Sequence, residues 1–99
     1  MVKKTVSVLA RVKAKQGMEN HVRRECLELV APSRQDKGCL GYELHQSTDD
    51  PGLFFFVESW TSKKDVENHL ETPHCVAFDE KVSTMLAEPE EIIFMEQIG

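Results

Sequence analysis

The chain has 99 residues, of which 40% are hydrophobic and 29% charged, and its formal net charge is -5. This length and composition suit one folded domain over residues 1–99 and exclude intrinsic disorder. The twelve Lys and Arg are scattered, so we expect no nucleic-acid partner. Residues 1–4 carry no apolar leader and no apolar run reaches membrane-spanning length, so we expect a cytoplasmic protein with no membrane partner.

The first half of the chain predicts a strand, a helix and a second strand. Apolar residues alternate over residues 5–13, the period of a strand, and recur at helical spacing over residues 18–30. Pro32 should kink the last turns of this helix or end it, because proline lacks an amide hydrogen. The second strand is expected over Cys39–Thr48, before the Asp-Asp-Pro-Gly turn at 49–52.

The third predicted strand, Leu53–Trp60, is apolar on both faces. One face would carry Leu53, Phe55 and Val57, and the other Phe54, Phe56 and Trp60. A single layer of helices covers only one face of a sheet. We therefore expect the other face to pack against a second copy of the chain, giving a homodimer.

Two helices and a final strand are expected in the second half of the chain. Ser62 with Asp65 resembles a capping box for a short helix through about residue 70. Thr72–Pro73 supplies the cap and first residue of another helix, and Ile92–Ile98 reads as the last strand. The order strand, helix, strand, strand, helix pair, strand indicates an α+β domain of the ferredoxin-like (βαββαβ) class.

Two of the four histidines are candidates for chemistry. His69 and His74 lie five residues apart across a helix break, unlike the four-residue spacing of a zinc helix motif, so we expect no metal. Either imidazole could act as a general acid or base near neutral pH. The alternative is that His74 is a partly exposed residue of a first helical turn. His21 and His45 are expected on the surface.

Glu58 is unusual because it shares a strand face with Phe54, Phe56 and Trp60. A carboxyl group in such surroundings must be paired, solvated by a pocket, or neutral with a raised pKa. It is therefore either a catalytic group or a residue that fixes the dimer interface through a hydrogen bond or salt bridge.

Aromatic residues complete a candidate pocket. Trp60 could stack on an aromatic ligand, and the Tyr42 phenol could donate or accept a hydrogen bond. With Phe56, Phe78 and the histidines, they form the mostly apolar lining that is typical of a small-molecule site. The sequence has no glycine-rich phosphate loop, nucleophile elbow, or flavin or nicotinamide fingerprint, so we expect no cofactor.

The three cysteines, Cys26, Cys39 and Cys75, cannot all pair within one chain and do not have ligand spacing. We expect reduced thiols in or near the core. The alternative is a reactive thiol at Cys75, where a helix start would lower its pKa.

Several segments together resemble the antibiotic biosynthesis monooxygenase family. They are Ala10–Lys13 before Gly17, Ser33–Arg34, Gly38–Leu44, the Asp50–Pro51 turn, Phe56–Trp60, and His69–His74 with Phe78. The resemblance runs nearly end to end and implies a dimeric α+β barrel in which two sheets pack face to face. The family includes enzymes that oxidise polycyclic phenols or quinols with dioxygen, without metal or flavin.

The resemblance also implies roles for particular residues. His69, His74, Glu58 and Trp60 would be catalytic, with a histidine or Glu58 as base, while Tyr42, Phe56, Phe78 and Trp60 would surround an aromatic substrate. Haem-degrading members carry an asparagine on the first strand, and Ala10 stands near that position, which argues against haem. Three functions stay open: a cofactor-independent monooxygenase acting on a phenol or quinol, an isomerase of the autoinducer-processing type, and a non-catalytic ligand-binding dimer.

Overall fold

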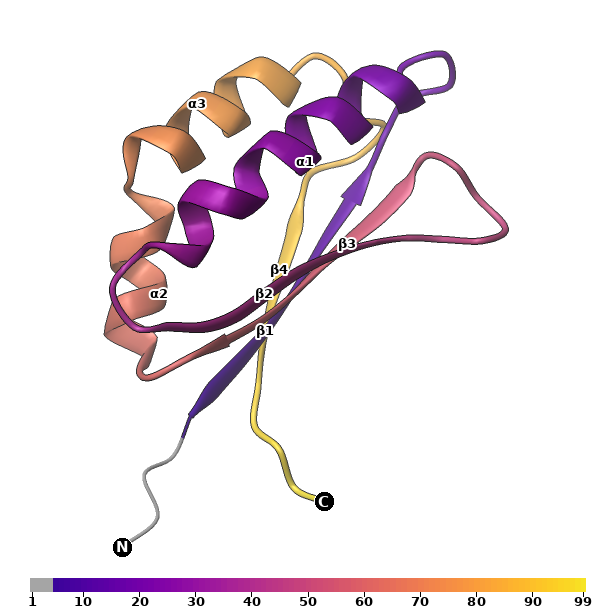
Figure 1. Cartoon of the computed structure of the whole chain (residues 1–99). Coiled ribbons are helices and arrows are strands. Elements are labelled where there is room, and N and C mark those ends of the chain that lie inside the picture. The colour runs from indigo at the N-terminus through magenta and orange to yellow at the C-terminus, as the bar shows by residue number, and fades with distance from the viewer. Residues whose placement is uncertain (1–4) are drawn as a thin grey trace, which may run out of the picture.

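The computed structural model describes residues 5–99 and confirms the ferredoxin-like α+β fold (Figure 1). Residues 1–4, where no leader was expected, lie outside the described part. The elements are β1 (Val6–Lys13), α1 (Glu19–Arg34), β2 (Cys39–Gln46), β3 (Leu53–Trp60), α2 (Lys63–Leu70), α3 (Pro73–Val82) and β4 (Glu91–Met95). Over residues 5–99, every helix is too short or too polar to cross a bilayer.

The four strands form one antiparallel sheet in the order β2-β3-β1-β4. Its central register pairs Ala10 with Phe56 on one side and with Ile92 on the other. Figure 1 shows α1 and α3 lying across one face of this sheet. The helices cover this face alone, and we call it the covered face.

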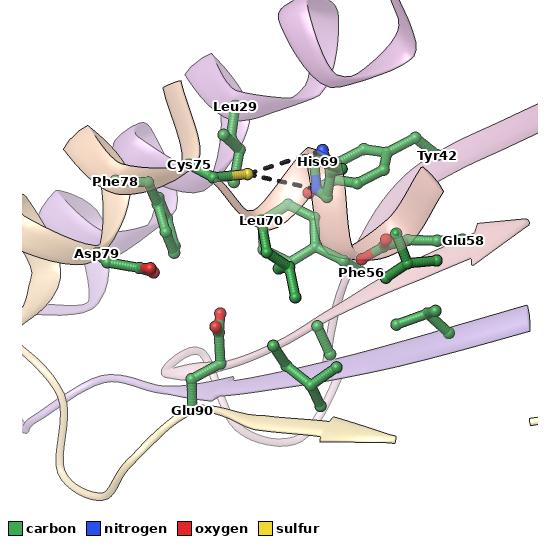
Figure 2. A pocket seen from close by; sticks show the side chains of 14 residues that line it. Leu29, Tyr42, Phe56, Glu58, His69, Leu70, Cys75, Phe78, Asp79 and Glu90 are labelled. Atoms are coloured by element: carbon green, nitrogen blue, oxygen red, sulfur yellow. Dashed lines mark hydrogen bonds between the residues drawn. The ribbon is translucent and has the colours of Figure 1, made fainter. Parts of the chain in front are cut away.

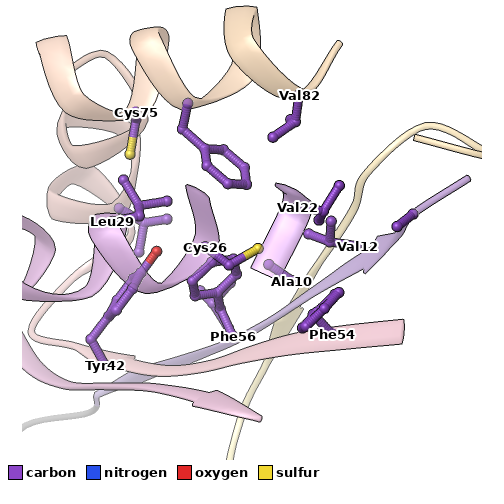
Figure 3. Packing of buried hydrophobic residues seen from close by; sticks show 14 of the residues in the cluster. Ala10, Val12, Val22, Cys26, Leu29, Tyr42, Phe54, Phe56, Cys75 and Val82 are labelled. Atoms are coloured by element: carbon purple, nitrogen blue, oxygen red, sulfur yellow. The ribbon is translucent and has the colours of Figure 1, made fainter. Parts of the chain in front are cut away.

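The core lies between the covered face and the helices (Figure 3). Alternate residues of the strands are buried on this face: Val8, Ala10, Val12, Tyr42, Phe54, Phe56 and Trp60. Helices α1 and α3 contribute Val22, Cys26, Leu29, Cys75, Phe78 and Val82. The period-two pattern of β3 thus has the orientation expected from the sequence.

The opposite face of the sheet has no helix of residues 5–99 over it and carries a group of apolar side chains together with charged ones such as Arg11, Lys13 and Glu43. We call it the open face, and its apolar members are Leu9, Leu53, Phe55, Val57, Ile93 and Met95. Val57, Ile93 and Met95 are 40%, 38% and 39% exposed. Exposed apolar side chains that gather on one face are typical of an interaction surface.

Both predicted helix caps in the second half of the chain are confirmed. Ser62 Oγ accepts a hydrogen bond from the Asp65 amide at 3.2 Å and donates to Asp65 Oδ2 at 3.0 Å. Thr72 Oγ1 accepts from the Cys75 amide at 3.4 Å, and Pro73 is the first residue of α3. Only Glu71 and Thr72 therefore separate α2 from α3.

Two strand boundaries differ from the sequence prediction, and of the two outcomes predicted at Pro32, the end of the helix does not occur. Helix α1 continues past Pro32 to Arg34, since a proline in the last turn removes only one helical hydrogen bond. Strand β2 ends at Gln46 rather than Thr48. Strand β4 ends at Met95 rather than Ile98, because Met95 already pairs with Ser7 near the start of β1.

Candidate functional site

A small cavity lies between the covered face and the helices (Figure 2). Its apolar lining consists of Val8, Ala10, Leu29, Phe56, Val66, Leu70, Phe78 and Ile92, and its polar lining of Tyr42, Glu58, His69, Cys75, Asp79 and Glu90. The cavity volume is about 30 Å³. That volume holds about two water molecules, so an aromatic ring does not fit without movement of the walls.

Glu58 lies at one end of this cavity, on the covered face of β3. The residue is 6% exposed, and its Oε1 accepts a hydrogen bond from Trp60 Nε1 at 2.9 Å. Burial raises the pKa of Glu58 to about 7, because the charged form loses its hydration, and the Trp60 hydrogen bond only partly opposes this. A carboxyl group with such a pKa can take or give a proton near neutral pH.

Glu90 and Asp79 lie at the other end of the cavity, with their carboxyl groups turned toward one another in Figure 2. Burial, together with the charge of Asp79, raises the pKa of Glu90 to about 7. Burial also raises the pKa of Asp79. Because Asp79 is an exposed residue, this end of the cavity faces the surface. Sequence reasoning did not identify either residue.

Aromatic side chains form the walls around Glu58. The Tyr42 ring lies 5.3 Å from the Phe56 ring and 5.5 Å from the His69 ring, and Phe78 meets Phe56 edge-on at 6.0 Å. Burial and the nearby Glu58 charge raise the pKa of Tyr42, so its phenol stays protonated. Tyr42, Phe56 and Phe78 thus line the cavity, as do Glu58 and His69.

Trp60 and His74 are placed differently from the other predicted site residues. Trp60 is fully buried outside the cavity lining, where its ring packs on His69 at 4.7 Å and its Nε1 holds Glu58. His74 is half-buried on α3 and also lies outside the lining. Neither residue lines the cavity. Both instead pack against His69, which does line it.

Behind the cavity wall, Asp36 joins the two histidines. Its Oδ2 lies 2.7 Å from His69 Nδ1 and 2.8 Å from His74 Nε2. His69 is 3% exposed, and burial lowers its pKa while Asp36 opposes that shift. Sequence reasoning missed Asp36, which lies between α1 and β2, 33 residues from His69. The sequence carries no local signal for this contact.

Cys75 completes this group, which we call the corner cluster: Asp36, His69, His74 and Cys75. The Cys75 Sγ lies 3.3 Å from His69 Nε2 and 3.7 Å from His69 Nδ1. Burial raises the pKa of Cys75 to about 12, so the alternative of a reactive thiol with a lowered pKa is wrong. All three cysteines are free, with Cys26 and Cys75 buried and Cys39 half-buried. Within residues 5–99, the donor atoms of His69, His74 and Cys75 form a group close enough to hold a metal ion.

The remaining histidines lie where the sequence placed them. His21 and His45 are both exposed, and His45 Nε2 lies 3.2 Å from Glu43 Oε1. The position near the asparagine of haem-degrading relatives is occupied by Ala10, which lines the cavity with a methyl group. A methyl group supplies no ligand or hydrogen bond there.

Comparison with solved structures supports the fold along the whole chain. The crystal structure of PA3566 from Pseudomonas aeruginosa has a TM-score of 0.92 at 30% identity, covering 100% of this chain and 99% of that one. The structure of Rv0793 from Mycobacterium tuberculosis has a TM-score of 0.88 at 23% identity, covering 96% of each chain.

Sequence comparison finds two relatives of this chain among known proteins. Rv0793, whose name describes it as a candidate monooxygenase, is 27% identical over 84 residues, covering 85% of this chain and 82% of that protein. The uncharacterized protein sll1783 from Synechocystis is 33% identical over 63 residues. That match covers 64% of this chain and only 43% of sll1783.

The family model described as antibiotic biosynthesis monooxygenase matches residues 5–81. This span includes α1, α2, α3 up to residue 81, the first three strands, the corner cluster and Glu58. The chain therefore belongs to the antibiotic biosynthesis monooxygenase family.

Proposed function

We propose that this protein oxidises a phenol- or quinol-type aromatic compound with dioxygen, and that Glu58 removes the phenolic proton. The observation that carries the proposal is a buried carboxyl group with a pKa of about 7 at one end of a mostly apolar cavity. A general base works best when its pKa lies near the working pH. Membership of the family agrees with this chemistry.

The reaction needs no external reductant when a hydroquinone is the substrate. Loss of a proton to Glu58 gives an electron-rich phenolate, which supplies the electrons that reduce dioxygen. One oxygen atom enters the ring and the other leaves as water, so hydroquinone and dioxygen give hydroxyquinone and water. The protein has to deprotonate, orient and desolvate the ring.

The cavity lining suits a neutral substrate. Phe56 and Phe78 offer ring faces and edges, and the protonated Tyr42 phenol offers a hydrogen-bond donor. Glu90 and Asp79 at the surface end would repel an anionic substrate whenever they are ionised. We therefore expect hydroquinones and polycyclic phenols to be better substrates than aromatic carboxylates.

Binding of a ring requires the cavity to widen. A volume of about 30 Å³ is well below the roughly 150 Å³ of a cavity known to hold benzene. Leu70 and Phe78, on the helix side of the lining, are the side chains that would have to move. The same small volume favours a second candidate function, a dimer that binds a small ligand without converting it.

We also propose that the working form is a homodimer that joins two open faces. The exposed apolar side chains of β1, β3 and β4 lie on that face together, and a two-fold axis would set each patch against its copy. The partner sheet would then support the sheet that carries Glu58 from behind.

Oxygen consumption with a panel of hydroquinones and polycyclic phenols tests the proposed reaction. We expect uptake by the wild type, a fall of about a hundredfold or more in Glu58→Gln, and little change in Glu43→Gln. Glu43 is a suitable control because it is an exposed carboxylate on the neighbouring strand.

Three other results would overturn the oxygenase proposal. Equal uptake by Glu58→Gln and wild type would remove Glu58 as base. Substrate conversion under nitrogen would indicate an isomerase. Binding without conversion in either atmosphere would indicate the ligand-binding dimer.

A further inference from the structure

The corner cluster brings three metal-binding side chains together, because ligand atoms of His69, His74 and Cys75 all lie within 4.8 Å of one another. The expectation that no metal binds rested on the five-residue spacing of His69 and His74 across a helix break. The structure overrides that expectation, because both imidazoles reach the same oxygen of Asp36 across the break. Cys75, one residue after His74, then lies beside His69.

We propose that the corner cluster binds one divalent transition-metal ion, best matched by zinc, through His69, His74 and Cys75, while Asp36 holds the two imidazoles in place. Zinc in proteins takes four ligands from cysteine, histidine and carboxylate groups in a tetrahedral arrangement. A thiolate favours zinc over magnesium or calcium, which prefer oxygen ligands alone. His69, His74 and Cys75 therefore supply three of the four ligands, and a water molecule would take the fourth position.

The distances within the cluster are close to those that zinc requires. Bonds of about 2.0–2.3 Å at tetrahedral angles separate neighbouring ligand atoms by about 3.3–3.6 Å. The Cys75 Sγ already lies 3.3 Å from His69 Nε2. Asp36 Oδ2 lies 2.7 and 2.8 Å from the two imidazoles, which are hydrogen-bond distances and suit a carboxylate that orients the ligating histidines.

The charges of the cluster also fit a dication. The Cys75 thiolate and the neighbouring Asp36 carboxylate carry two negative charges, and two neutral imidazoles carry none, so the cluster with zinc bound is neutral overall. Neutrality matters here because His69 and Cys75 are buried, where an uncompensated charge is costly. The metal would displace the thiol proton on binding.

Neighbouring groups hold the proposed ligands in place. Thr72 Oγ1 donates to the His69 carbonyl at 2.7 Å, and the Cys75 amide donates back to Thr72. The Asp36 amide donates to the Ser33 carbonyl at the end of α1, and the Trp60 ring packs on His69. Support of this kind fixes ligand orientation before a metal arrives.

Cobalt binding to the whole, chelator-treated protein tests this proposal. We expect Co²⁺ to give the absorption bands of a tetrahedral site together with a thiolate-to-cobalt charge-transfer band, saturating at one ion per chain. Zn²⁺ should displace the cobalt and raise the melting temperature, because a ligand that binds only the folded state stabilises it. Neither readout depends on catalytic activity.

Variants identify the ligands. Cys75→Ser should lose the charge-transfer band, and His74→Gln should weaken cobalt binding at least about tenfold. Cys39→Ser and His45→Gln are matched controls outside the cluster and should bind as the wild type does.

A wild type without a charge-transfer band would overturn the proposal and leave a hydrogen-bonded Asp36 bridge. A band that persists in Cys75→Ser would also overturn it. If Cys75→Ser does not fold, His74→Gln decides, because His74 is only half-buried. Wild-type cobalt affinity in that variant would contradict the assignment.

Discussion

Each face of the sheet holds side chains in unfavourable surroundings: a buried carboxyl group on the covered face and exposed apolar groups on the open face. On the covered face, Glu58 is 6% exposed, whereas its neighbour Val57 on the open face is 40% exposed. Burying a carboxyl group is costly, and so is leaving apolar side chains in water. The contrast suggests that the covered face is adapted to chemistry and the open face to a second copy of the chain.

The largest effect is expected when the open face is given a charge. Val57→Lys should abolish the proposed dimer, because each dimer would bury two unpaired ammonium groups at a cost of several kcal/mol each. Light scattering after size exclusion measures the mass. Val76→Lys on α3 is the control, since Val76 is similarly exposed, at 44%, but lies on a helix. A monomeric wild type would show that the open face does not join two copies of the chain.

Neighbouring phenylalanines of β3 compare the two faces directly. Phe54→Ala should reduce the free energy of unfolding by about 3–5 kcal/mol, because Phe54 is fully buried in the core. Phe55→Ala should cost less, and its loss should depend on protein concentration if the open face is an interface. Urea denaturation at two protein concentrations measures both effects. If both variants lost the same free energy of unfolding at both protein concentrations, the two faces would not differ as proposed.

The buried carboxyl group makes stability depend on pH. Because the pKa of Glu58 is raised from 4.5 to about 7, its contribution to stability is full below pH 4.5 and is lost as the pH rises through 7. Relative to Glu58→Gln, the wild type should lose up to about 3 kcal/mol between pH 4.5 and pH 8. Urea denaturation across this range is the measurement. Parallel pH curves for the two proteins would show that Glu58 is not buried as described.

The smallest effect is expected at the cap of α2. Ser62→Ala should cost about 1 kcal/mol, since the Asp65 amide loses its acceptor. The substitution loosens the layer over the covered face and leaves the open face intact. Thermal unfolding should therefore shift while the mass in solution stays unchanged. A change in mass would show that the two faces are coupled.

Much of the fold could be predicted because buried apolar residues recur in the sequence with the period of a strand or a helix. Alternation in β3 assigned Phe54, Phe56 and Glu58 to one face, and the Ser62 and Thr72 caps located two helix starts. The limit of β4 was missed because it depends on where its partner β1 begins, which no local pattern encodes.

The candidate site was predictable only in part. Glu58 stood out because a carboxylate within an aromatic strand is rare, and residue type identified Tyr42, Phe56 and Phe78. Asp36 and Glu90 lie outside helices and strands, where acidic residues are ordinary, so only tertiary contacts reveal them. Periodicity placed Trp60 on the correct face, but its depth beneath His69 depends on how the helices cross the sheet.

The turn between α2 and α3 also bears on the order in which the chain folds. Contacts of Thr72 and Cys75 with His69 span three and six residues, whereas Asp36 is 33 and 38 residues from its two histidines. Short loops close at a lower entropic cost than long ones. The turn between α2 and α3, with its contacts among His69, Thr72 and Cys75, can therefore form early. Asp36 joins these residues only when β2 docks. Substitutions of Thr72 or Cys75 should then lower the folding rate, whereas substitutions of Asp36 should mainly raise the unfolding rate.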